Sequence, residues 1–122
     1  MYIQKRIKVS INWFRPEEGG RKVIVSGYHY RPTIIIPKND TDRHWSFLID
    51  FYSLPEYDHP TLTEGAFLAD FSDGVPWGIM NIGTEFWVME GSKKVGYGNV
   101  IEKCREIDVR ELPSYKDIEE GG

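Results

Sequence analysis

The stretch from Arg6 to Trp13, Arg-Ile-Lys-Val-Ser-Ile-Asn-Trp, decides the fold class. Its apolar residues Ile7, Val9, Ile11 and Trp13 alternate with polar residues. This period of two is typical of a β-strand that buries one face, because successive side chains of a strand point to opposite sides. The stretch therefore predicts a half-buried strand.

Similar short runs follow along the chain. β-Branched or alternating residues occur at 22–26, 33–36, 45–51, 67–71, 85–89 and 94–102, with Pro and Gly between them to form turns. No stretch shows a helical period of 3.6 residues over a helical length. These features predict an all-β barrel or sandwich of about six or seven strands. Ten of their apolar side chains are expected to share one core: Ile7, Val9, Ile11, Trp13, Phe47, Ile49, Phe67, Phe71, Phe86 and Val88.

Length and composition limit the functional classes. The 122 residues suit one domain, and 40% hydrophobic with 28% charged residues indicate a folded chain. The 15 Lys and Arg against 19 Asp and Glu give a net charge of −4, which excludes a strongly basic nucleic-acid binder but allows a local basic patch. The single Cys104 cannot form an intrachain disulfide, and no apolar run reaches the ~20 residues of a membrane span. We expect a cytoplasmic protein without membrane contact.

Four segments carry a resemblance to a known family. They are Glu17–Arg21 (Glu-Glu-Gly-Gly-Arg), Ser26–Pro32 (with Gly-Tyr and Tyr-Arg-Pro), Gly83–Gly91 and Lys94–Val100 (Lys-Val-Gly-Tyr-Gly-Asn-Val). In this order they resemble the C-terminal β-barrel, the third domain, of bacterial translation elongation factor Tu (EF-Tu). The resemblance implies a six-stranded antiparallel, Greek-key-like barrel over 1–104, followed by an acidic C-terminal extension over 105–122.

The chain also departs from that family. Residues 33–42 replace the family's aromatic strand and its turn containing Thr-Thr-Asp. No phosphate loop of the form Gly-x-x-x-x-Gly-Lys-Ser/Thr occurs, and such a loop is what cradles nucleotide phosphates. We therefore expect the chain to bind no GTP.

The resemblance implies a set of tRNA-facing residues. The third domain of EF-Tu contacts the T-stem backbone of aminoacyl-tRNA, and the matching positions here are Arg21, Lys22, Thr33, Glu90 and Gly91. Lys22 replaces the family's usual His, and Thr33 replaces its Gln. Arg and Lys neutralise phosphates, and a glycine N–H can approach a nucleic-acid backbone closely. The residues therefore favour a module that contacts tRNA or another RNA.

A plainer interpretation of the same residues remains open. Arg21 and Lys22 would then be solvated side chains that leave a hairpin, and Gly91 would only form a turn. Lys93 and Lys94 lie on the same hairpin and would extend a basic edge, although lysines beside a turn are common. The acidic net charge favours this interpretation.

The aromatic residues support a second functional hypothesis. Aromatic residues make up 14% of the chain, and Tyr28, Tyr30, Tyr52, Tyr57 and Trp77 fall in predicted turns or loops. Exposed aromatic side chains beside charges are typical of protein interfaces, whereas the alternative is packing over the barrel ends. Tyr57 and Trp77 are the candidates for docking a protein partner, such as a toxin or a translation factor. The chain would then be an inhibitor, an immunity-like factor or a competitor for the partners of EF-Tu.

Enzyme signatures are weak. His29, His44 and His59 lack the spacing of metal ligands, and no nucleophile accompanies them. Cys104 is expected to be a small core or edge residue rather than a nucleophile. We therefore expect no catalytic residue, no metal and no cofactor, and predict a noncatalytic binding module.

Overall fold

The computed structural model describes residues 3–25, 29–37, 43–68 and 76–112. Its regular elements there are short strands and 3₁₀ turns, without an α-helix in these ranges. In chain order they are β1 (Ile3–Trp13), η1 (Pro16–Glu18), β2 (His29–Tyr30), β3 (Thr33–Ile35), β4 (Trp45–Phe51), β5 (Thr61–Phe67), η2 (Trp77–Ile79), β6 (Glu85–Glu90), β7 (Lys93–Val100), β8 (Arg105–Asp108) and η3 (Val109–Glu111).

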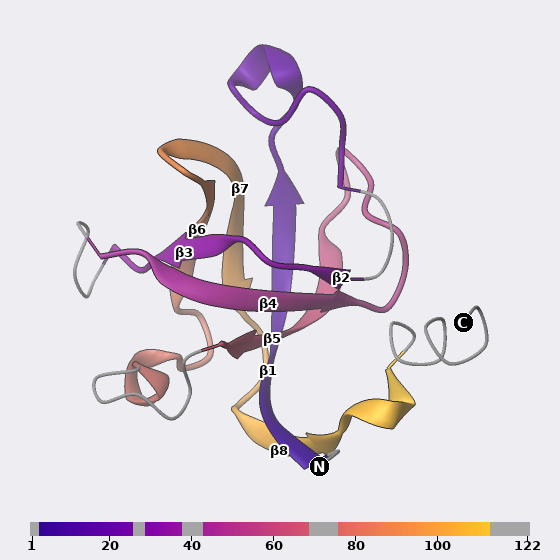
Figure 1. Ribbon diagram of the computed structural model, residues 1–122, viewed down its shortest axis with the longest axis vertical. Helices are drawn as coiled ribbons and strands as arrows, with labels where there is room; N and C mark the ends of the chain where they lie inside the picture. The colour runs from indigo at the N-terminus through magenta and orange to yellow at the C-terminus, as the bar shows by residue number, and fades with distance from the viewer. Residues whose placement is uncertain (1–2, 26–28, 38–42, 69–75, 113–122) are drawn as a thin grey trace.

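Six of these strands close into an antiparallel barrel (Figure 1). The order around the barrel is β4, β3, β6, β7, β1 and β5, and β5 pairs again with β4. The consecutive strands β3, β4 and β5 are neighbours, and the connection after β5 returns β6 to the side of β3, which is a Greek-key arrangement. The predicted all-β, six-stranded antiparallel barrel is confirmed. A barrel alone does not identify the third domain of EF-Tu.

Two further strands extend the barrel wall. β2 pairs with β4, and β8 pairs with the first residues of β1. β8 belongs to the part that the sequence assigned to an acidic C-terminal extension, and residues 113–122 lie outside the described residues.

The core forms as the alternation predicts. The predicted core residues that the structure describes are all buried in one cluster, whereas Phe71 lies outside the described residues. Large rings fill the barrel against glycines on neighbouring strands. A Cβ atom at Gly65 would lie 2.5 Å from Cζ of Phe47, and one at Gly98 would lie 2.5 Å from Cζ of Phe86. The two glycines are therefore required by close packing.

Two of the predicted strands differ in the structure. Residues 22–25 form no strand: Val23 is 71% exposed and only Val25 is buried, so the run does not present one continuous buried face. Of the strand predicted over 67–71, Phe67 is the last residue of β5 (Thr61–Phe67), which begins six residues earlier than predicted. Residues 69–71 lie outside the described residues. The predicted hairpin between β6 and β7 is confirmed, with Gly91 in its turn at φ 60°.

Candidate functional site

Most of the residues predicted to face tRNA meet at one end of the barrel. The β6–β7 hairpin places Glu90 and Gly91 there, and Thr33 pairs with Met89, the residue before Glu90. Arg21 arrives from the loop after η1, and its Nε lies 2.8 Å from Oε2 of Glu90. We call the predicted set of Arg21, Lys22, Thr33, Glu90 and Gly91 the barrel-end cluster.

Tyr30 holds the centre of the barrel-end cluster together. Its hydroxyl donates a hydrogen bond to the Glu90 carboxylate, and the Arg21 guanidinium lies over its ring, 5.8 Å from the centroid. Burial, reinforced by Glu90, raises the pKa of Tyr30 above its ordinary value. The sequence placed Tyr30 in a turn or loop, but it lies in strand β2. The Arg21 side chain is therefore held in place by these contacts. It is about one third exposed and forms an ion pair with Glu90.

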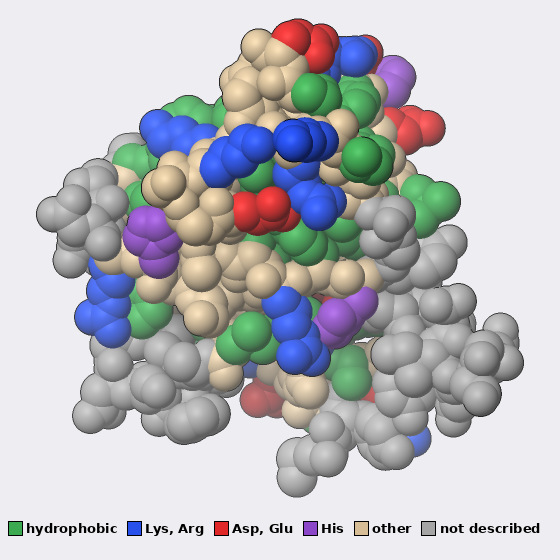
Figure 2. All heavy atoms as spheres, turned by 45° about the horizontal axis from the view of Figure 1, so that its top comes forward, with side chains coloured by type: hydrophobic (Ala, Val, Ile, Leu, Met, Phe, Trp, Pro, Cys, Tyr) green, Lys and Arg blue, Asp and Glu red, His purple; other side chains and the backbone are tan. Residues whose placement is uncertain are grey.

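Basic side chains gather around this end (Figure 2). Lys22 and the hairpin residues Lys93 and Lys94 are exposed, and Nζ of Lys94 lies 4.2 Å from the centroid of the Trp87 ring. Of the cations at this end, Arg21 contacts the Glu90 carboxylate directly, and Lys93 is the ladder partner of Glu90 across the hairpin. Acidic residues also lie at this end, among them Glu17 and Glu18 of η1, so the cations are interspersed with carboxylates.

Tyr57 and Trp77 do not share a surface. The Arg15 guanidinium lies 4.9 Å from the centroid of Tyr57, whereas Nζ of Lys5 lies 5.2 Å from that of Trp77. Lys5 is near the start of β1 and Arg15 lies just beyond its end, so about 30 Å of extended strand separates the two contacts. Both aromatic residues are partly buried and pack against the core. They therefore cover opposite ends of the barrel.

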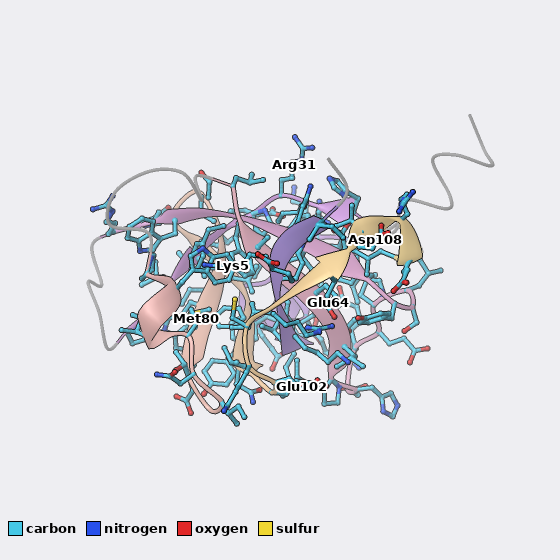
Figure 3. The ribbon with its side chains drawn as sticks, turned by 90° about the horizontal axis from the view of Figure 1, so that it is seen from below. Lys5, Arg31, Glu64, Met80, Glu102 and Asp108 are labelled. Carbon is cyan, nitrogen blue, oxygen red and sulfur yellow. The ribbon has the colours of Figure 1, made fainter. Side chains whose placement is uncertain are left out.

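The outer surface of the barrel wall carries a buried charge network that the sequence did not reveal. Asp50 and Glu64 face each other across β4 and β5, and Arg6 and Arg105 face each other across β1 and β8. Nη1 of Arg6 lies 2.6 Å from Oδ2 of Asp50, and the Arg105 guanidinium donates two hydrogen bonds to the Glu64 carboxylate. These four residues, the charge quartet, join β8 to the barrel wall. Figure 3 labels Glu64 beside β8.

Further polar groups extend the charge quartet toward solvent. Nδ1 of His29 lies 2.8 Å from Oδ1 of Asp50, and Nε of Arg31 donates to Nε2 of His29 at 3.2 Å. On the other side, the Tyr52 hydroxyl donates to the Glu64 carboxylate. Burial, reinforced by this hydrogen bond, raises the pKa of Tyr52 to about 12.

The raised pKa of Tyr52 predicts a loss of stability at high pH. A neutral phenol that folding favours contributes stability that is fully present below pH ~10 and is lost as the pH rises to about 12. We expect the wild-type protein to lose more unfolding free energy between about pH 9 and pH 12 than Tyr52→Phe, which has no phenol to ionise. Urea denaturation of both proteins at the two pH values measures the difference. Equal losses would contradict the prediction.

A metal cluster and a membrane-spanning helix each require a particular arrangement of residues. Within 3–25, 29–37, 43–68 and 76–112, no group of three or more His, Cys, Asp or Glu side chains is placed to hold a metal ion. No helix in the same ranges is long and apolar enough to cross a bilayer. Cys104 is partly exposed, between β7 and β8.

The structure defines the class of the protein, a small six-stranded antiparallel β-barrel with an added outer strand, β8, that is linked to the barrel wall by the charge quartet. Comparison with known proteins matches no family model and no curated sequence.

Proposed function

We propose that the protein is a noncatalytic binding module that contacts the backbone of RNA, with tRNA as the leading candidate, through the barrel-end cluster. The observation that supports this most is that Arg21, Thr33 and the adjacent pair Glu90 and Gly91 come from three segments of the chain and meet at one end. The matching positions face tRNA in the third domain of EF-Tu, which the sequence resembles.

The chemistry of this end suits a phosphate backbone. Exposed Lys22, Lys93 and Lys94 supply cations, and Arg21 supplies a guanidinium whose ion pair and ring contact already restrict its motion. A side chain that is ordered before binding loses less entropy when it binds. The Glu90 carboxylate repels phosphate, so the phosphates would lie around it rather than over it.

The number of phosphates neutralised is expected to be small. About three or four cations at roughly 0.7 per phosphate for a single strand give a log–log salt slope no steeper than about −3, and the slope is somewhat steeper for a duplex such as a tRNA stem. A much steeper slope would mean that a larger surface of the protein contacts the RNA.

Charge reversal at Arg21 and Lys22 tests the proposal. We expect Arg21→Glu with Lys22→Glu to abolish the gel shift of tRNA at low salt, because two cations become anions at the proposed contact. The melting temperature should change little, since an ion pair of partly exposed side chains such as Arg21–Glu90 contributes about 1 kcal/mol.

A matched control separates local from overall charge. Lys103→Glu with Arg110→Glu changes the net charge equally, beside β8 at the other end of the barrel, and is expected to keep RNA binding. An equal loss of RNA binding in both double variants would mean that the net charge of the protein, rather than the barrel-end cluster, determines binding. A wild-type protein that shifts no RNA at low salt would remove the proposal.

Protein interaction is a second candidate function. The observation that favours it is the presence of large exposed apolar side chains, with Ile3 50% and Leu68 41% exposed at the rim of one pocket. Tyr57 and Trp77 are weaker docking candidates, because they lie far apart and partly serve the core. In this case Arg21→Glu with Lys22→Glu should leave partner binding intact.

A further inference from the structure

The barrel wall opens where β1 leaves β5. β1 pairs with β5 from Ile7, opposite Gly65, up to Ile11, but its earlier residues 3–6 pair with β8 alone. β5 continues past Gly65 to Phe67, paired with β4 alone. Within the described residues, both strands therefore present an unpaired edge over this part of the wall.

A pocket of about 520 Å³ lies at this divergence. Residues of both separated strands line it, among them Lys5 of β1 and Ala66 of β5, and Leu48 of β4 contributes to the wall. Its volume falls in the range of about 300–1,000 Å³ that is typical of ligand sites. Figure 3 views the barrel from the end where β8 lies and labels Lys5 and Arg31, two basic residues of the pocket lining.

The lining combines apolar and basic groups. Leu48 and Ala66 are almost fully buried in the wall, whereas Leu68 and Ile3 project from the rim, 41% and 50% exposed. Basic Lys5 and Arg31 stand against a single acidic residue of the lining, Glu106, so the pocket carries a net positive charge. An occupant with apolar and acidic groups is complementary to both properties.

The unpaired edges distinguish an extended peptide from a compact ligand. An edge strand offers a row of free N–H and C=O groups, and an incoming strand satisfies them while its alternate side chains enter pockets. Successive residues of a strand point to opposite faces, so a peptide that alternates apolar and acidic residues can place the first kind on the apolar pocket wall and the second kind on the opposite face, toward Lys5.

We infer that the opening between β1 and β5 is a docking site for an extended segment of a partner protein that alternates apolar and acidic residues and pairs as an added strand. The inference deepens the protein-interaction candidate and is independent of RNA contact, because the opening lies at the end of β1 opposite the barrel-end cluster.

A labelled peptide of the sequence Glu-Val-Glu-Ile-Glu-Val-Glu tests the inference by fluorescence anisotropy. We expect it to bind the wild-type protein, and to shift the amide NMR signals of residues 3–6 and 66–68. Two control peptides should bind at least tenfold more weakly: one with every Glu replaced by Lys, and one with Pro in place of Ile, which cannot complete the ladder.

Leu62, on the outer face of β5, and Leu68, directly after the end of β5, provide matched variants. Leu68→Glu places a carboxylate at the rim of the pocket and is expected to weaken binding of the peptide at least tenfold. Leu62→Glu changes a residue that is 40% exposed, against 41% for Leu68, but lies away from the pocket, and it should leave binding unchanged.

Failure of this inference is distinguishable from failure of the RNA proposal. Absence of peptide binding up to about 1 mM, equal binding of the lysine peptide, or equal weakening by Leu62→Glu would overturn the docking site. Leu68→Glu should retain whatever tRNA gel shift the wild type gives, since the barrel-end cluster is unchanged, and a loss of that shift would also count against two separate sites.

Discussion

Replacement of Arg6 by Met is expected to lower the free energy of unfolding by about 3–5 kcal/mol. Arg6 is only 3% exposed, and its guanidinium compensates the charge of Asp50, which is 2% exposed. The variant keeps the apolar stem of the side chain but removes this charge from beside a buried carboxylate. Urea denaturation followed by circular dichroism measures the loss.

Two controls show whether burial of the pair is the cause. Lys8→Met changes a neighbouring basic residue on the same face of β1, whose ion pair with Glu102 is more exposed, and should cost less than about 1 kcal/mol. Arg6→Met combined with Asp50→Leu removes both charges and should recover much of the loss, because apolar replacement of a whole buried pair is often tolerated. Equal losses for Arg6→Met and Lys8→Met would contradict the role given to the charge quartet.

Truncation of Trp13 to Ala is expected to cost a similar amount, about 3–5 kcal/mol. The Trp13 ring is 6% exposed and packs on Tyr30 and Phe51, with centroid distances of 5.9 and 6.0 Å. Its Nε1 also donates a hydrogen bond to Oγ1 of Thr61 at 3.1 Å. The variant leaves a cavity in the core and a buried hydroxyl that has lost its donor.

Trp87→Ala is the matched control for Trp13→Ala. Trp87 is only partly buried, packs beside Phe14 and Tyr97 and lies outside the core cluster, so its truncation should cost clearly less. Denaturation curves of the two variants give the comparison. A smaller loss for Trp13→Ala than for Trp87→Ala would contradict the assignment of Trp13 to the core.

The strands that the sequence predicts well are those in which apolar residues alternate with other residues along the run. Ile7, Val9 and Ile11 alternate with polar residues because β1 has one side in the core, and the pattern identifies the strand directly. The run over 22–25 has the same β-branched composition but little burial, and there the prediction is wrong. Composition indicates a strand only where a partner strand is present to pair with it.

The charge quartet could not be found by the same reasoning. Arg6, Asp50 and Glu64 occupy positions on the outer face, where the period-two pattern predicts exposure. In the structure they contact one another and the side chains of Arg105 and His29, and the Arg105–Glu64 contact joins residues 41 positions apart. Like charges that face each other across a ladder are destabilising unless oppositely charged side chains compensate them. The sequence does not show that Asp50 faces Glu64, because the register between β4 and β5 is set by the tertiary structure.

The candidate site was predicted in part. Resemblance to a known barrel selected Arg21 and Glu90, and they form an ion pair in the structure. Tyr30, which joins them, could not be assigned this role because its place depends on pairing with Ile49 in β4. RNA contact by these residues stays a prediction.

The pairing of β1 has a consequence for the order of events during synthesis. β1 emerges first, yet its ladder partners are β5, β7 and β8, and β5 begins about fifty residues later. At roughly 5–20 residues per second on the ribosome, β1 waits several seconds for its first partner and longer for the second. The apolar face of β1 lacks these ladder partners during that interval, and the barrel cannot close until β7 has also been synthesised.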